Sequence, residues 1–173
     1  MPSPISLSQY VLGQQKLQPE ARGELSAIMT QISLGGKMIA QDLRQVGLLD
    51  ILGATGEVNV QGEEVQKLDA RANDTFVQVL KSSKIIRTII SEEMEEPYTV
   101  LPAKQTGKYA VFFDPLDGSS NVDINAPLGS IFSIHCLSAS SSSSDNGDYL
   151  KPGIEQVVGG YILNGTSTVL VYT

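Results

Sequence analysis

The strongest chemical signal in the sequence is an acidic turn, Asp114–Asp117, which directly follows the strand-like segment Lys108–Phe113. Pro115 fixes the backbone of this turn, so its two carboxylates can converge on one point, as a hard cation with oxygen ligands requires. The next residues, Gly118–Ser120, offer successive backbone N–H groups and two hydroxyls, which suit a phosphate. The pattern predicts neighbouring metal and phosphate sites, with an ordinary Asp-rich β-turn as the alternative.

A second acidic group, Ser91–Glu96, follows the strand-like segment Lys84–Ile90. Its last two residues, Glu95–Glu96, are interpreted as a solvated surface, which is the usual role of a charge run. The pair Glu92–Glu93 stands at the strand terminus, where a sheet could place it beside Asp114–Asp117. Four carboxylates without a counter-ion repel one another, so they either spread into solvent or share divalent cations. The residues alone leave both alternatives open.

Two helices are predicted to support these turns. Apolar residues recur at helical spacing over Glu24–Val46, and Gly35–Gly36 inside this helix indicates close packing of another backbone or a bend. A second helix is predicted over Val65–Lys81, with Asp69 at the edge of its apolar stripe and an ordinary surface Asp as the alternative. The glycine-rich segment Leu52–Gly62 shows no helical period and predicts a loop that could act as a lid.

After the second helix the sequence pattern changes to that of β-strands, with segments rich in Val, Ile, Phe and Tyr. Helices followed by strands indicate an α+β fold, in which a helix pair packs on a mainly antiparallel sheet, because no helical pattern separates the last three strands. A polar surface loop is expected over Ser138–Gly147. The predicted strands are Lys84–Ile90, Lys108–Phe113, Ser130–Cys136, Gln156–Leu163 and Thr166–Tyr172.

Composition limits the class of protein. The 173 residues carry 12 basic and 19 acidic side chains, a net charge of −7, without a dense Lys/Arg run, so nucleic acid is not an expected partner. The single cysteine, Cys136, excludes an intramolecular disulfide and indicates the cytoplasm, with a plastid as the alternative. Neither a signal peptide nor an apolar run of about 18 residues is found, so no membrane association is expected. The lone histidine, His135, is interpreted as a packing residue.

The acidic turns lie within a longer set of motifs: DILGATGEVNVQGEEVQKLD at 50–69, SEE at 91–93, GKYAVFFDPLDGSSNVD at 107–123, GSIFSI at 129–134 and STVLVYT at 167–173. Together they resemble the class I fructose-1,6-bisphosphatase family of lithium-sensitive, Mg²⁺-dependent sugar phosphatases. The shorter DPxDG signature alone would indicate only the wider superfamily, which includes inositol monophosphatases. The resemblance implies that residues 1–173 are the N-terminal half of a layered α/β/α/β/α fold, in a chain that is expected to be truncated.

The resemblance implies hydrolysis of the 1-phosphate of fructose 1,6-bisphosphate to fructose 6-phosphate and phosphate, in gluconeogenesis or the Calvin cycle. Two or three Mg²⁺ ions are implied as cofactors, with Mn²⁺ or Zn²⁺ as substitutes. Asp69 and Glu93 would orient and deprotonate the attacking water, and Asn59–Glu64 would close over the metals, with Glu63 where the family usually has Asp. The implied metal ligands are Glu92, Glu93, Asp114, Asp117 and the Leu116 carbonyl, and the implied substrate-binding residues are Asp117, Gly118, Ser119, Ser120 and Asn121.

The family is commonly inhibited by AMP, at a site formed by the start of the first long helix and a Lys-Tyr pair. A helix N-terminus suits a phosphate, and the matching residues here are Gly23, Glu24, Leu25, Ser26, Lys108 and Tyr109. Two positions depart from the family pattern, since Arg22 replaces a usual small residue and Cys136 falls where an Arg is common. Ordinary helix capping by this segment is therefore the alternative.

Other functions remain open at the level of the sequence. The chain is expected to hold only part of the active site, because the family's second half supplies another acidic ligand and the sugar-binding groups. One alternative is a related phosphatase acting on sedoheptulose 1,7-bisphosphate or on inositol phosphates. Another is a non-catalytic partner or regulatory subunit, which associates with full-length subunits through the sheet edge at Val169–Tyr172. Full-length members of the family are typically homotetramers, which implies the same assembly here.

Overall fold

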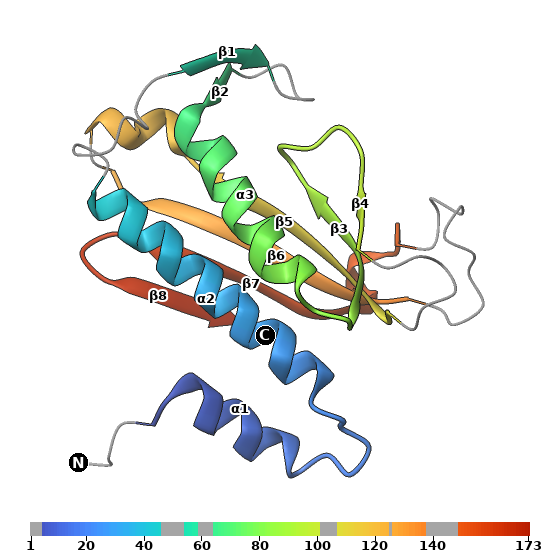
Figure 1. Cartoon of the computed structure of the whole chain (residues 1–173). Coiled ribbons are helices and arrows are strands. Elements are labelled where there is room, and N and C mark those ends of the chain that lie inside the picture. Colours follow the sequence, from blue (N-terminus) through green and yellow to red (C-terminus); the bar gives the residue numbers. More distant parts are fainter. Residues whose placement is uncertain (1–4, 46–53, 59–63, 101–106, 125, 138–148) are drawn as a thin grey trace.

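The computed structural model describes residues 5–45, 54–58, 64–100, 107–124, 126–137 and 149–173. In this part of the chain a helix pair lies on one face of a six-stranded sheet, and a short two-stranded ribbon stands at one end (Figure 1). The structure thus confirms the predicted α+β fold. No helix among the described residues is both long enough and apolar enough to cross a membrane.

The helix pair consists of α2 (Glu24–Arg44) and α3 (Lys67–Lys81), close to the predicted helices. Each forms because its apolar residues recur every three or four positions and so fall on one buried stripe. In α3 the stripe includes Asp69, which is buried together with its apolar neighbours. The core between helices and sheet includes Ile28, Ile32 and Ile39 of α2, Leu68, Phe76 and Leu80 of α3, and Ile89, Val111, Phe132 and Ile162 of the sheet.

The two glycines inside α2 allow side chains of its neighbours to approach closely. A Cβ built on Gly35 would lie 2.9 Å from the ring of Phe76 in α3, and one on Gly36 would meet the end of Ile162 in the sheet. The predicted explanations were the approach of another backbone or a bend, but the structure shows packed side chains instead. The glycines therefore set how closely α2 lies against α3 and the sheet.

A further helix, α1 (Leu7–Gln15), was not predicted from the sequence. It contacts α2 but buries none of its own residues, so it lacks the apolar stripe by which a helix is recognised. Its start does carry a local signal, a capping box in which Ser6 Oγ accepts from the Gln9 backbone N–H at 3.1 Å and Gln9 Oε1 accepts from the Ser6 N–H at 2.8 Å.

The six-stranded sheet has the order β4-β3-β5-β6-β7-β8. The β4–β3, β5–β6, β6–β7 and β7–β8 pairs are antiparallel, in agreement with the mainly antiparallel sheet that was predicted, and only the β3–β5 pair is parallel among the described strands. The short edge strand β4 was not predicted. The strands are β3 Ile86–Ser91, β4 Tyr98–Thr99, β5 Tyr109–Asp117, β6 Leu128–Cys136, β7 Gln156–Asn164 and β8 Thr168–Tyr172, with 3₁₀ turns at Ser119–Ile124 and Gly153–Glu155.

The predicted loop Leu52–Gly62 is wrong in part. Residues Ala54–Val58 form strand β1, which pairs with β2 (Glu64–Gln66) directly before α3. The glycine content indicated a loop, because glycine is uncommon inside strands. Gly56, with φ +85°, lies where the pairing register between β1 and β2 shifts. Val65 belongs to β2, so α3 starts at Lys67 and not at Val65 as predicted. The expected Ser138–Gly147 loop lies outside the described residues, as do residues 59–63.

Candidate active site

The parallel pairing of β3 and β5 brings the two acidic segments together. Ser91, the last residue of β3, lies opposite Phe113 of β5, and the backbone N–H of Glu92 donates to the Phe113 carbonyl at 3.1 Å. The next residue of each chain segment, Glu92 and Asp114, therefore emerges at the same edge of the sheet. The sequence had left this juxtaposition open as one of two alternatives for the acidic segments.

The carboxyl groups of Glu92 and Asp114 interact directly. Burial, hydrogen bonding with the Glu92 carboxyl and the Glu92 charge raise the pKa of Asp114 to about 7, and the charge of Asp117 acts in the same direction. A backbone hydrogen bond from Leu116 N to Asp114 Oδ1, at 3.0 Å, opposes the rise. The negative form of Asp114 is therefore disfavoured by burial and by the neighbouring acidic groups, so this position favours a positive charge.

The predicted turn after Phe113 is wrong, because β5 continues through Asp114–Asp117, with an irregular pairing register between these two residues. This acidic segment is held firmly by its surroundings. Pro115 and Leu116 are buried, and the Ser130 hydroxyl donates to the Pro115 carbonyl at 2.8 Å. Gly118 has a φ of +83°, the left-handed conformation that glycine adopts without strain. The segment from Pro115 to Gly118 therefore presents its backbone from a fixed frame.

Asp69, which starts α3, reaches the same turn. Its carboxylate is buried, with an exposed fraction of 4%, and its Oδ2 accepts a hydrogen bond from Ser119 Oγ at 2.9 Å. The alternative of a surface Asp is wrong, because α3 packs its first turn against the end of β5. The contact joins one of the two residues predicted to act on water to one of those predicted to hold phosphate.

The remaining acidic residues of the second segment, Ser91–Glu96, differ in how far they are exposed to solvent. Glu93 is half-buried, and its backbone N–H donates to Ser91 Oγ at 3.3 Å, which closes the turn after β3. Glu95 and Glu96 are exposed and belong to the solvated surface that the charge run predicted. Glu93 is therefore positioned beside Glu92 by the same strand end.

The fit of a metal ion rests on the Glu92–Asp114 pair. Two neighbouring carboxyls, of which Asp114 has a raised pKa, are a donor set that suits a hard divalent cation. Within the described residues, however, no three acidic, histidine or cysteine side chains gather closely enough to hold a metal ion by themselves. Glu63 and the rest of the predicted closing segment up to residue 63 lie outside the described residues, as does the side chain of Asn121.

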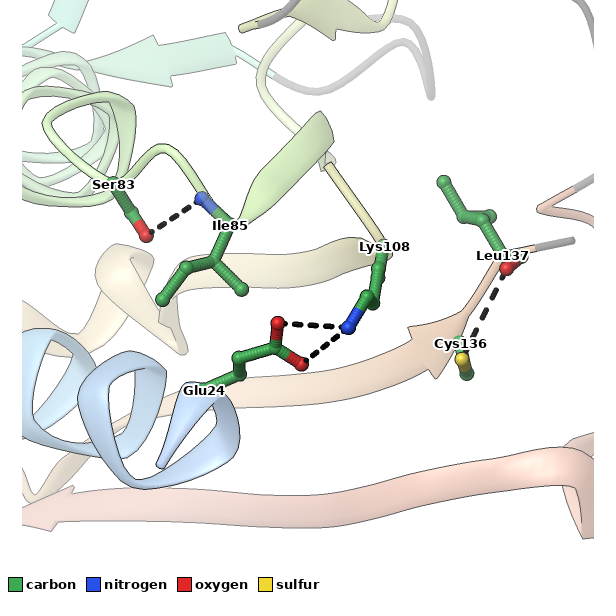
Figure 2. A network of polar contacts seen from close by, with 6 residues as sticks. All are labelled: Glu24, Ser83, Ile85, Lys108, Cys136 and Leu137. Carbon is green, nitrogen blue, oxygen red and sulfur yellow. Dashed lines mark hydrogen bonds and ion pairs between the residues drawn. The ribbon is translucent and has the colours of Figure 1, made fainter. Parts of the chain in front are cut away.

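A separate cavity of about 650 Å³ lies where α1, the start of α2 and the start of β5 meet. Lys108 Nζ donates to both carboxylate oxygens of Glu24, at 2.8 and 3.0 Å, and so links β5 to the first turn of α2 (Figure 2). The helix start has no side-chain cap, since Gly23 is the N-cap with φ +81°. The lining includes all six residues matched to the nucleotide site, namely Gly23, Glu24, Leu25, Ser26, Lys108 and Tyr109.

Part of this cavity could not be predicted, because α1 supplies it. Tyr10, Gln14 and Gln15 of α1 line the cavity, and Gln15 Oε1 accepts from Ser26 Oγ at 3.0 Å. The Ser6 capping box is a local sequence signal that could have located this helix.

Cys136, the last residue of β6, is exposed. The carbonyl of Leu137 lies 3.9 Å from its sulfur (Figure 2).

Comparison with known proteins identifies the family to which this chain is similar. The family model described as "Fructose-1-6-bisphosphatase, N-terminal domain" matches residues 5–173. A class 1 fructose-1,6-bisphosphatase of Crocosphaera subtropica is 48% identical over 170 residues, which are 97% of this chain and 48% of the relative. One of Chlorobium phaeovibrioides is 44% identical over 98% of this chain and 51% of the relative. This chain thus spans about half the length of the curated relatives it matches.

Solved structures agree with the sequence relatives. The holo form of Leishmania major fructose-1,6-bisphosphatase superposes with a TM-score of 0.88 at 34% identity, over 99% of this chain and 52% of that chain. The T-state of the same enzyme superposes with a TM-score of 0.81 at 32% identity. Fold, acidic turns and sequence therefore agree, and this chain belongs to the fructose-1,6-bisphosphatase family, of which it carries the N-terminal domain.

Proposed function

We propose that this chain supplies the metal- and phosphate-binding half of a Mg²⁺-dependent enzyme that hydrolyses the 1-phosphate of fructose 1,6-bisphosphate. The observation that carries the proposal is the convergence of two contacts on one turn. The Glu92–Asp114 carboxyl pair stands at the start of the turn, and the Asp69–Ser119 hydrogen bond stands at its end. Such a site suits a phosphorylated substrate neutralised by a cation.

Glu92 and Asp114 would hold Mg²⁺, together with Glu93, Asp117 and the Leu116 carbonyl. When bound, Mg²⁺ neutralises charge on the phosphoryl oxygens and lowers the pKa of a coordinated water. The Glu92–Asp114 pair suits this role because a cation relieves the repulsion that raises the pKa of Asp114. Pro115 and Leu116, which lie between Asp114 and the proposed phosphate-binding backbone, are buried and limit the movement of this segment.

The phosphate would lie against Gly118, Ser119 and Ser120, whose backbone N–H groups follow the left-handed Gly118. Asp69 fixes the Ser119 hydroxyl and presents a carboxylate at the same turn. With Glu93, it would orient the attacking water and take its proton, the role of a general base within hydrogen-bond reach. Burial keeps the Asp69 carboxylate in one orientation.

The test joins this chain, in one polypeptide, to the second half of the Crocosphaera subtropica relative, giving a protein we call the joined protein. We expect it to release phosphate from fructose 1,6-bisphosphate in the presence of Mg²⁺. Asp114→Asn should lower kcat by about a hundredfold or more, whereas Asp74→Asn on the exposed side of α3 should not. A folded joined protein that prefers sedoheptulose 1,7-bisphosphate or inositol 1-phosphate, or is inactive on all three, would contradict the proposal.

We also propose that the cavity at the start of α2 is an AMP effector site. The support for this is Lys108, which lies beside a helix N-terminus without a side-chain cap. Glu24 competes with a phosphate for this ammonium group. Calorimetry with the isolated chain should detect AMP binding, and Lys108→Ala should weaken this binding about tenfold. Adenosine should bind more weakly than AMP.

Full-length chains would assemble as cytoplasmic homotetramers, which sedimentation of the joined protein tests.

A further inference from the structure

Helices α2 and α3 lie side by side and are bonded to each other near both ends of α3 (Figure 1). Just past the end of α3, Ser82 Oγ accepts a hydrogen bond from Gln31 Nε2 of α2 at 3.2 Å. Near the start of α3, Arg71 is paired with Asp42, which lies close to the end of α2. The two helices therefore run in opposite directions, and the Asp42–Arg71 pair holds the end of α3 at which Asp69 lies.

The Asp42–Arg71 pair has the geometry of a two-pronged clamp. Arg71 Nε donates to Asp42 Oδ2 at 2.7 Å, and Arg71 Nη2 donates to Asp42 Oδ1 at 3.0 Å. Two parallel bonds from the planar guanidinium fix the orientation of the carboxylate as well as its distance. The side chains are 48% and 15% exposed for Arg71 and Asp42, and an ion pair near the surface contributes little to stability. The contribution of this pair is therefore one of geometry.

The position of Asp42 is not explained by α2 alone. Asp42 lies in the last turn of this helix, which ends at Arg44. The free carbonyl groups there give the end of a helix a partial negative charge, so a carboxylate is unfavourable at this place. Arg71 supplies the opposite charge from the neighbouring helix. The pair thus joins the two helices rather than stabilising α2 by itself.

Arg71 lies two residues after Asp69 in the first turns of α3, which begins at Lys67 directly after β2. Backbone hydrogen bonds make a helix rigid over one turn, so a movement of α3 at Arg71 also moves Asp69. The Asp69 carboxylate is buried, and its Oδ2 accepts from Ser119 Oγ at 2.9 Å. A shift of about 1 Å would break this contact, because a hydrogen bond tolerates little change in distance.

We propose that Asp42 and Arg71 are positioning residues for Asp69. The pair fixes the start of α3 against α2, and this keeps the Asp69 carboxylate against Ser119 at the phosphate-binding segment. Neither residue touches the substrate; both act through Asp69. The inference rests on the proposed function, in which Asp69 orients the attacking water and takes its proton.

The first test measures phosphate release by the joined protein. Arg71→Met keeps the apolar stem of the side chain and removes the clamp, so we expect kcat to fall about fivefold, with KM within about twofold. Asp42→Ala should have the same effect. The two changes together should lower kcat no further than either alone, because they remove one contact. Ser82→Ala is the matched control, since it breaks the bond to Gln31 at the other end of α3 and should leave kcat unchanged.

The second test does not depend on activity and uses the isolated chain. Ser119→Ala removes the hydrogen-bond partner of Asp69, and its effect on the urea midpoint is measured with and without Arg71→Met. When the clamp is absent, Asp69 is no longer held against Ser119. The downward shift caused by Ser119→Ala should therefore be at most about half as large in the Arg71→Met chain. In the Ser82→Ala chain the shift should keep its full size.

The proposal is overturned by equal midpoint shifts in the unchanged and Arg71→Met chains. An unchanged kcat, a change confined to KM, or an equal loss of kcat from Ser82→Ala would also overturn it. Additive losses from Asp42→Ala and Arg71→Met would show that the two residues act separately. A folded joined protein without activity rejects the proposed function instead, and the midpoint shifts then decide the positioning role by themselves.

Discussion

At the residue scale, burial makes the hydrogen bond between Asp69 and Ser119 important for stability as well as for position. A carboxylate with an exposed fraction of 4% has lost most of its hydration, and the Ser119 hydroxyl replaces part of it. We expect Ser119→Ala to lower the free energy of unfolding of the isolated chain by about 1–2 kcal/mol. Ser120→Ala is the matched control, because its side chain is exposed. Urea unfolding that gives the same midpoint for both variants would contradict this role.

His135 gives a pH-dependent contribution to stability. The side chain is buried, its ring contacts Phe112 with centroids 5.1 Å apart, and burial, followed by the charge of Lys151, lowers the pKa of its imidazole. The unfolded chain therefore binds a proton at this residue more readily than the folded chain does. The free energy of unfolding should fall as the pH drops below about 6.5, the ordinary value for histidine.

The variant His135→Leu isolates this effect, because the chain has no other histidine and the carboxyl groups are unchanged. Urea unfolding at pH 7.5, 6.5 and 5.5 should show a smaller loss of stability on acidification for the variant than for the unchanged chain. Parallel pH profiles for the two proteins would show that the imidazole titrates alike in the folded and unfolded states. The prediction that His135 is a packing residue agrees with its burial.

At the element scale, two adjacent glycines of β7 have different surroundings. A Cβ on Gly160 would lie 2.6 Å from the Val171 carbonyl oxygen of β8 and 2.6 Å from the ring of Phe132. Gly160→Ala should lower the free energy of unfolding by about 2–3 kcal/mol, since the backbone of a neighbouring strand must shift. Gly159→Ala meets only the end of the Gln156 side chain, at 3.2 Å, and should cost less than about 0.5 kcal/mol. Equal thermal midpoints for the two variants would contradict this packing.

The elements differ in how much of them the sequence could predict. α2 and α3 follow from apolar periodicity, because each buries one stripe. α1 buries no residue and β1 contains a glycine, so neither has the pattern by which it would be recognised. The predicted start of the second helix, Val65, was also wrong, because α3 begins at Lys67. Val65 fits the apolar stripe of a helix but belongs to strand β2.

At the scale of the whole molecule, the exposed apolar side chains of β6, β7 and β8, which we call the outer apolar patch, should behave differently in the isolated chain and in the joined protein. The patch consists of Ile131, Tyr161, Leu163, Val169 and Val171. Tyr161→Lys removes apolar surface that is 46% exposed in the isolated chain, so its free energy of unfolding should change by less than about 0.5 kcal/mol. In the joined protein the same charge would be buried without a partner, and the loss should reach about 3 kcal/mol or more. Calorimetric unfolding of both proteins measures the difference, and equal losses would place the side chain in solvent in both.

The sequence by itself determined the chemistry that this chain can offer and the segments that offer it. The turn Asp114–Asp117, the residues Glu92–Glu93 and the glycine-serine turn are local patterns, because residue type and near spacing fix what they can bind. Strand composition correctly placed Glu92–Glu93 directly after a strand, whereas Asp114–Asp117 form the last residues of β5 and not a turn after it. The mainly antiparallel sheet followed from the missing crossover helices.

Only the tertiary structure decided which of these groups meet. The parallel register of β3 and β5 puts Glu92 against Asp114, and the packing of α3 buries Asp69 beside Ser119. The cavity beside Lys108 required α1, and the outer apolar patch required the strand order that aligns Ile131, Tyr161 and Val171. These contacts join residues far apart in the chain, and sequence periodicity reports only which face of an element is buried, not which partner buries it.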